Sequence, residues 1–302
     1  MIATADYELV TEAAGWTERP GGATVLLRGG ETIDFLQGQV TNDVEALAPG
    51  TGCYAAVLNH KGKLRTDLRV LRGDDWFQLD TDQVGAAVLI HMVQTYTLGR
   101  DVTVEDLSSA RSLLRLVGPA ADGALDTAPP AGEDSFVEGE HGLYVRTALG
   151  VDVFTADLDA AVAALGLPRA SDEAVECVRV ESGRPRLGLD MDGDTIPQEA
   201  GINERAVSFT KGCYVGQETV ARLHYKGRPN RHIRGLRLAA PAARGDEILL
   251  GDKVVGRVGS ACEAPRFGPI ALALVRREAG PGDEVLVAGT PATVAELPFA
   301  GD

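Results

Sequence analysis

The chain has 302 residues, 44% of them hydrophobic and 24% charged, as in globular proteins that bury a large core and divide into two or more domains. Its formal net charge of -15 argues against a broad electrostatic grip on nucleic acid or on an anionic membrane. Residues 1–10 lack the basic flank and apolar stretch of a secretory signal, so we expect a cytoplasmic protein with no membrane association and no direct nucleic-acid partner.

The first two thirds of the chain mix strands, helices and antiparallel hairpins, a pattern typical of an α+β layer. Apolar and β-branched runs between turn residues predict strands over 53–58, 64–70, 76–79, 102–107, 113–117, 143–147 and 151–155. Helical spacing and stop signals predict helices over 31–40, 82–96, 157–165 and 171–182. We expect Asp82 to cap the second of these helices and the Pro- and Gly-rich stretch 128–140 to be an exposed loop.

The pattern changes after about residue 232, where short strands alternate with Gly and Pro. These strands are predicted over 233–238, 247–250, 253–258, 270–275, 284–287 and 292–297. Their spacing indicates a small barrel or sandwich. We therefore expect one domain over 1–232 and a second over 233–302.

The four cysteines are scattered without a Cys-x-x-Cys pair, and the five histidines show no His-Glu-x-x-His spacing. This distribution argues against a disulfide framework and against a metal site held by the protein.

The most unusual segment is 211–222, which reads KGCYVGQETVAR. Glycines on both sides of Cys213 free the backbone for a shaped loop, and a thiol beside the ammonium of Lys211 tends to ionise easily. A small buried apolar residue is the alternative role for a free cysteine. The polar, glycine-rich setting favours an exposed functional thiol.

Two further features have competing interpretations. Glu199, in the stretch 195–201, is either an ordinary loop acid or a carboxylate that pairs with two adjacent N–H donors of a heterocycle. The basic run 226–237 is either a solvated rim or a site for the carboxylates of an anionic small molecule. Asp67 is an unusual residue for a strand and otherwise reads as part of a cap or turn.

Taken together, these motifs resemble the YgfZ family, folate-binding relatives of the glycine-cleavage T-protein. Residues 211–218 match every position of the hallmark Lys-Gly-Cys-aromatic-x-Gly-Gln-Glu. Further support comes from 35–44, 61–64, 196–200 and 220–222, so that the similarity spans roughly residues 25 to 240.

The resemblance implies a fold and a set of site residues. The fold is a three-lobed ring of T-protein type around a channel that holds tetrahydrofolate, with a C-terminal β-barrel as the third lobe. The implied folate-binding residues are Glu199 at the pterin, Arg231 at the folate tail, Asp67 and Tyr214. The implied reactive residues of the loop are Cys213, Lys211 and Gln217.

The resemblance also implies a function, which is support of the assembly or repair of iron–sulfur enzymes, with downstream effects on thio-modification of tRNA. Partners would be folate and iron–sulfur proteins or their assembly factors. The alternative is a folate-dependent aminomethyltransferase or demethylase. In the stretch 62–68, Thr66 stands where the T-protein has one of two acids, which argues against aminomethyl transfer. A third interpretation is a folate-binding interaction module in which Cys213 is structural.

Overall fold

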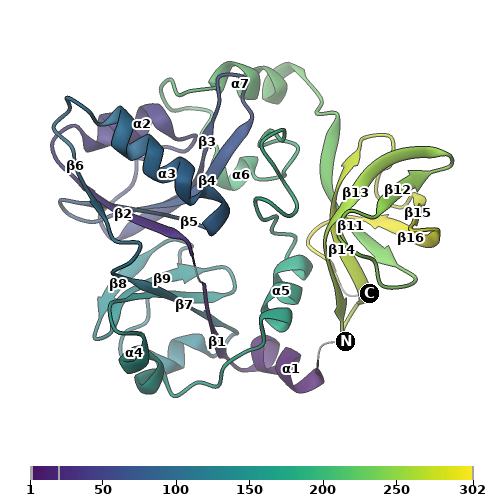
Figure 1. The fold of residues 1–302 in the computed structure, drawn as a ribbon, viewed down its shortest axis with the longest axis horizontal. Helices are drawn as coiled ribbons and strands as arrows, with labels where there is room; N and C mark the ends of the chain where they lie inside the picture. Colours follow the sequence, from purple (N-terminus) through teal and green to yellow (C-terminus); the bar gives the residue numbers. More distant parts are fainter. Residues whose placement is uncertain (1–2, 20, 301–302) are drawn as a thin grey trace.

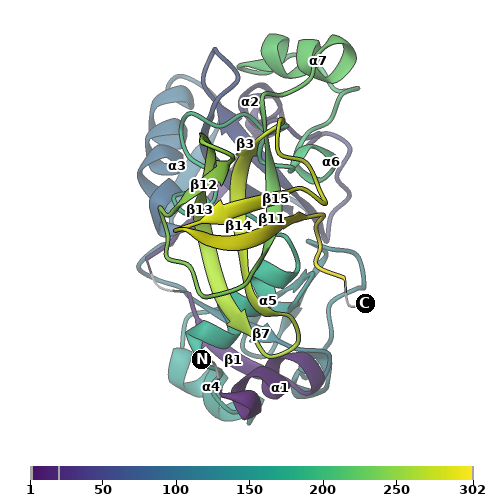
Figure 2. The same cartoon turned by 90° about the vertical axis from the view of Figure 1, so that its right-hand side faces the viewer.

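Three β-sheet lobes arranged in a ring make up the structure, a computed structural model that describes residues 3–19 and 21–300 (Figure 1). Within these residues, two open five-stranded sheets form the first and second lobes, and a closed barrel forms the third. Figure 2, in which the barrel faces the viewer, shows the two open-sheet lobes one above the other behind it. The expected α+β architecture with a C-terminal barrel is confirmed.

The first lobe is an antiparallel sheet with strand order β3-β4-β5-β2-β6, packed against two helices. Its elements are β2 (Ala23–Arg28), α2 (Thr32–Gln39), β3 (Thr51–Leu58), β4 (Leu64–Arg72), β5 (Phe77–Thr81), α3 (Gln83–Tyr96) and β6 (Thr103–Asp106). Buried and partly exposed residues alternate along the first half of β4, as the two-residue period of a strand requires. Phe35 and Leu36 of α2 and Leu89 and Met92 of α3 close the core over the sheet.

The second lobe has the antiparallel strand order β1-β7-β10-β9-β8. Its elements are β1 (Gly15–Glu18), β7 (Ser112–Val117), the 3-10 helix η1 (Ala121–Ala124), β8 (Phe136–Gly139), β9 (Gly142–Thr147), β10 (Gly150–Thr155) and α4 (Leu158–Leu165). Because β1 pairs with β7, the chain contributes one strand to this lobe, then forms the whole sheet of the first lobe, and then adds the remaining strands of the second lobe. The two lobes are therefore intertwined in the order of the chain.

The third lobe is a barrel with strand order β11-β14-β13-β12-β15-β16. Its strands are β11 (Arg231–Leu238), β12 (Glu247–Leu250), β13 (Lys253–Ala264), β14 (Gly268–Arg276), β15 (Glu284–Val287) and β16 (Thr290–Ala295). Strand β13 is longer than predicted because a bulge between Val258 and Ser260 bends it and pairing with β14 continues beyond.

Helices α1 (Thr4–Glu12), α5 (Asp172–Glu181), α6 (Asn203–Ala206) and α7 (Gln217–Lys226) connect the lobes. Ser171 caps the start of α5 by accepting a hydrogen bond from the amide of Ala174. Shortly after the last residue of the helix, Gly183 adopts a left-handed conformation with φ 69°, which ends the helical path of the chain. The irregular chain after α5 runs between the first lobe and the barrel, and α7 lies at the far end of the first lobe (Figure 1).

Some local expectations were wrong. Helices α1 and α6 and strands β1 and β2 had no sequence prediction. Helix α7 begins inside a segment expected to be a loop, and β8 lies inside the stretch expected to be an exposed loop, where Phe136 is buried. Asp82 precedes α3, but its side chain makes no capping hydrogen bond. Its carboxylate lies 3.1 Å from Arg19 instead, because an ion pair between lobes competes with the cap.

Candidate functional site

Three of the motifs described above meet around one apolar cluster. Tyr54 and Leu64 of the β3–β4 hairpin, Ala200 of the irregular segment and Tyr214 of the KGCYVGQE loop all belong to it. We call this set the central cluster; its buried members are Ala56, Leu58, Leu64, Leu187, Met191, Ala200, Ile202, Ala206, Val207, Tyr214 and Val220. Of the predicted site residues, Tyr214 belongs to this cluster, and Glu199 and Cys213 are each next in sequence to a member. Lys211, Gln217, Asp67 and Arg231 lie farther from the cluster along the chain.

The two glycine turns of the site touch each other. Gly216 has φ 85°, and a Cβ there would lie 2.5 Å from the carbonyl oxygen of Asn59 and 3.1 Å from the Cα of Gly62. Gly62 has φ 77°, and a Cβ there would lie 2.8 Å from Thr219. Only glycine satisfies both the backbone angle and the close approach. The hairpin turn thus supports the start of α7.

Lys211 is buried, and its ammonium binds the end of α2. Its Nζ donates hydrogen bonds to the carbonyl oxygens of Gln37 at 2.9 Å, Val40 at 2.7 Å and Asn42 at 2.6 Å. Carbonyls at a helix C-terminus lack partners within the helix and favour a positive charge. Burial lowers the pKa of Lys211 to about 8. Lys211 therefore anchors the loop to the first lobe.

Cys213 is exposed, whereas its neighbour Tyr214 is buried. The ring of Tyr214 packs in the central cluster with the Lys211 ammonium 5.3 Å from its centroid, and burial raises the pKa of Tyr214 to about 12. Gln217 is the first residue of α7, and its backbone amide donates to the carbonyl oxygen of Tyr214 at 3.3 Å. Anchors on both sides thus hold the loop while the thiol faces outward.

Glu199 and Arg231 form a bidentate ion pair. The Arg231 guanidinium donates from Nε to Oε1 at 3.1 Å and from Nη2 to Oε2 at 2.8 Å. Glu199 is 7% exposed, and the side chain of Arg231 is 32% exposed. The hydrogen bond that Arg231 donates to Glu199 raises the pKa of Arg231. The backbone joins the same two segments, since the amide of Ile233 donates to the carbonyl oxygen of Glu199 at 2.7 Å.

Asp67 lies on β4 and accepts a hydrogen bond from the hydroxyl of Tyr54 on the neighbouring strand at 2.7 Å. Burial raises the pKa of Asp67 to about 6, although the Tyr54 hydrogen bond opposes the shift. The side chain of the preceding residue, Thr66, points to the opposite face of the sheet and is fully buried. Asp67 is thus a carboxyl group that changes its charge near neutral pH.

Sequence reasoning did not find Tyr54, Arg205 or Asn42 as site residues. The guanidinium of Arg205 lies 4.7 Å from the centroid of the Tyr54 ring. The amide nitrogen of Asn42 donates to the carbonyl oxygens of Tyr54 at 2.8 Å and of Arg205 at 2.9 Å. The hairpin register, which places Tyr54 diagonally to Asp67, is the signal that could have revealed this tyrosine.

Comparison with known proteins identifies the chain's relatives. The family model of the GCVT N-terminal domain matches residues 2–136, and that of the glycine cleavage T-protein C-terminal barrel domain matches residues 231–300. The tRNA-modifying protein YgfZ of Serratia proteamaculans is 30% identical over 262 residues, which cover 81% of this chain and 78% of that protein. The chain belongs to the family of YgfZ and the glycine-cleavage T-protein.

Other members of this family carry a different name. The aminomethyltransferase of a Nostoc species is 29% identical over 98% of this chain and 87% of that protein. The crystal structure of glycine cleavage system aminomethyltransferase T from Bartonella henselae superposes with a TM-score of 0.88 over 98% of this chain and 89% of that chain, at 22% identity. This likeness confirms the expected T-protein type of fold.

Two cavities, of about 310 Å³ and 260 Å³, lie away from the central cluster, beside the barrel and beside α1. Among residues 3–19 and 21–300, no group of three or more His, Cys, Asp or Glu side chains is placed to hold a metal ion. Nor does any helix in those ranges combine the length and apolar character needed to cross a membrane.

Proposed function

We propose that this protein is a cytoplasmic tetrahydrofolate-binding protein that supports the assembly or repair of iron–sulfur enzymes through Cys213. The observation that carries the proposal is the pairing of Glu199 with Arg231 beside the central cluster. The loop that Tyr214 anchors in this cluster presents the exposed thiol of Cys213. The Serratia relative is named as a tRNA-modifying protein, which agrees with the downstream effect on tRNA that such a role would have. Partners would be iron–sulfur proteins or their assembly factors.

The residues around Glu199 fit a folate. A carboxylate offers about four acceptor positions, so Glu199 can accept from a pterin while it keeps part of its bond to Arg231. Within the part of the chain that the structure describes, the buried acceptors Gln198 Oε1 and Asn203 Oδ1 lack a hydrogen-bond partner. Such atoms are costly unless a ligand or water satisfies them. The partly exposed Arg231 is suited to a carboxylate of the folate tail.

When bound, tetrahydrofolate would supply a carrier for one-carbon units. The chain's own contribution is to hold and orient it: Glu199 and Arg231 provide charge-assisted hydrogen bonds, and the partly buried rings of Tyr54 and Phe209, packed against the central cluster, provide apolar surface. Lys211 and Tyr214 keep the loop in place, so that the Cys213 sulfur stays available to a partner thiol, to an iron or sulfur species or to a folate-borne group.

The first test is calorimetric titration of tetrahydrofolate into the Glu199→Gln variant. We expect folate binding to weaken by about 1–3 kcal/mol, because a charged hydrogen-bond acceptor is lost. Glu296→Gln is the matched control, since Glu296 also pairs with a barrel arginine but its side chain is 71% exposed. Unchanged affinity in Glu199→Gln would refute this folate site.

The second test replaces Cys213 with Ser or Ala in cells that depend on this protein, and scores the activity of iron–sulfur enzymes. We expect both variants to fail while purified protein still binds folate, because the sulfur is exposed and outside the proposed folate contacts. Normal enzyme activity with Cys213→Ala would discard the reactive-thiol role and favour a folate-binding interaction module.

The alternative function is folate-dependent aminomethyl transfer or demethylation. The Asp67–Tyr54 pair favours it, because a carboxyl group with a pKa of about 6 can take up and release a proton near neutral pH. Purified protein supplied with tetrahydrofolate and an aminomethyl donor decides between the two: turnover that is lost in Asp67→Asn would support the transferase.

A further inference from the structure

A cysteine of helix α5 and a cysteine of the barrel meet where α5 packs against the barrel. Cys177 lies on α5 and Cys262 on β13, and their sulfur atoms are 2.6 Å apart although the residues are 85 positions apart in the chain. Both are present as thiols. The separation is only about 0.6 Å longer than the S–S bond of a disulfide.

The two sulfurs differ in their surroundings. Cys177 is fully buried, and its Sγ donates to the carboxylate of Glu181 at 3.7 Å. The hydrogen bond with Cys262 and burial both raise the pKa of Cys177, and burial also raises that of Glu181. These groups keep Cys177 protonated and place a proton acceptor beside it.

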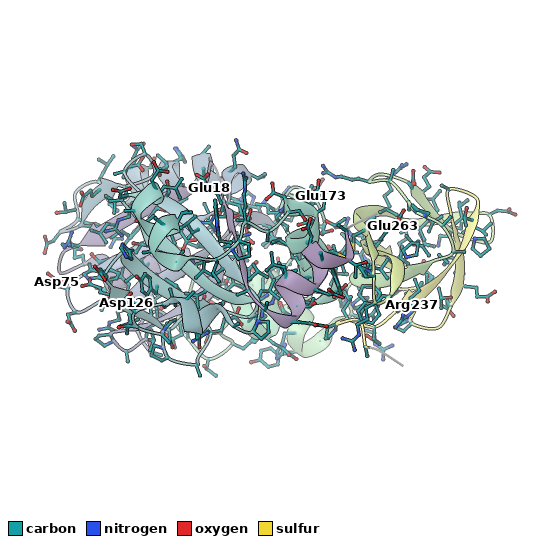
Figure 3. The ribbon with its side chains drawn as sticks, turned by 90° about the horizontal axis from the view of Figure 1, so that it is seen from below. Glu18, Asp75, Asp126, Glu173, Arg237 and Glu263 are labelled. Carbon is teal, nitrogen blue, oxygen red and sulfur yellow. The ribbon has the colours of Figure 1, made fainter. Side chains whose placement is uncertain are left out.

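Cys262 is half-buried and lines the cavity of about 310 Å³ at this junction. Glu173 of α5 and Glu263 of β13 belong to the same lining, and Figure 3 labels both at the boundary between α5 and the barrel. A small oxidant such as hydrogen peroxide fits in a space that is several times the roughly 30 Å³ of a water molecule. The oxidant can therefore reach Cys262 before it reaches Cys177.

We propose that Cys177 and Cys262 form a reversible disulfide, with a peroxide as the oxidant, that ties α5 covalently to the barrel. This inference is independent of the proposed folate function. It assigns a redox site to the junction of α5 and the barrel, in a different part of the ring from the exposed thiol of Cys213.

The chemistry balances in two steps. The Cys262 sulfur attacks the peroxide O–O bond, which gives a sulfenic acid and one water. The Cys177 sulfur then attacks the sulfenic sulfur while its proton passes to Glu181, and the hydroxide that leaves becomes water by taking up a proton. In total, two thiols and one hydrogen peroxide give one disulfide and two waters. A small dithiol reverses the reaction by thiol–disulfide exchange.

The test uses the Cys213→Ser protein, in which Cys53, Cys177 and Cys262 are the remaining cysteines. After treatment with hydrogen peroxide, we expect the intact mass to fall by about 2 Da, since two hydrogens leave when a disulfide forms. Peptide mapping should join the Cys177 and Cys262 peptides, and a dithiol should restore both thiols. The crosslink should also raise the melting temperature by about 5 °C.

Cys53→Ser in the same background is the matched control and should keep the crosslink, whereas Cys262→Ser should lose it. If a variant fails to fold, peptide mapping of the peroxide-treated wild-type protein should show the same crosslink between Cys177 and Cys262. The proposal is overturned if Cys262 oxidises but remains a sulfenic or sulfinic acid, if the crosslink joins another pair, or if both thiols survive the peroxide treatment.

Discussion

Single side chains at the site take their roles from neighbours that are distant in the sequence. Lys211 is two residues from Cys213, which suggested an ammonium that activates the thiol. In the fold its three hydrogen bonds go to carbonyls at the end of α2. A role of Lys211 in the chemistry of Cys213 stays a prediction, but its ammonium is committed to anchoring the loop. Asp67, by contrast, has an environment that changes its chemistry.

At this residue scale we predict the effect of Asp67→Asn on stability. Because burial raises the pKa of Asp67 to about 6, its ionised form is less favourable in the folded chain than in the unfolded chain. Between pH 4 and 6 the folded state therefore binds more protons than the unfolded state. The contribution of Asp67 to the free energy of unfolding falls as pH rises through that window. Asp67→Asn should be more stable than the wild type by about 1–3 kcal/mol at pH 8.

Urea denaturation at several pH values measures this effect. The difference between variant and wild type should shrink as pH falls from 8 to 4, where Asp67 is neutral in both states. A difference that does not change with pH would contradict the assigned ionisation.

At the scale of elements, the segment 211–222 is half loop and half helix. Sequence patterns predicted a loop throughout 211–222, but α7 begins at Gln217. The helix escaped prediction because its sequence is mostly polar and Val220 is its buried residue, so few apolar positions mark a helical face. Its start depends on the hairpin turn against which Gly216 packs.

We therefore predict that Gly216→Ala destabilises the protein by about 1–3 kcal/mol, because alanine at φ 85° is strained and its Cβ would collide with the carbonyl of Asn59. Gly212→Ala is the control in the same loop, since a Cβ there meets nothing within 4 Å. Thermal unfolding of both variants checks this. Equal melting temperatures would show that the two turns do not need their close contact.

At the scale of the whole molecule, two buried arginines join the lobes. Arg69 of the first lobe binds Asp80 at 2.8 Å and Asp152 of the second lobe at 3.0 Å. Arg179 of α5 binds Asp190 at 2.9 Å and donates to the hydroxyl of Ser260 in the barrel at 2.6 Å. Buried charges are stable only when paired, so these networks allow one arrangement of the lobes.

Removing one partner should accordingly be costly. We predict that Asp190→Ala lowers the free energy of unfolding by about 3–5 kcal/mol, because Arg179 keeps only the more exposed Glu176 as a counter-charge and the amides of Arg186 and Ser260 lose their acceptor. Glu247→Ala, which breaks an exposed pair with Arg257, should change it by less than about 1 kcal/mol. Denaturant unfolding of both variants provides the comparison, and similar losses would contradict the role of burial.

Local sequence determined most strands of the three lobes, although not β1, β2 or β8, together with the start of α5 at Ser171 and the family motif around Cys213. Periodicity, caps and glycine turns involve residues that are a few positions apart. Only the tertiary structure decided the partners of Lys211, which lie up to 174 positions away, the pairing of Glu199 with Arg231 and the contact of Cys177 with Cys262. The physical reason is that these contacts arise from the packing of separate lobes around a shared core. No short stretch of sequence encodes which of its polar groups will face which distant surface.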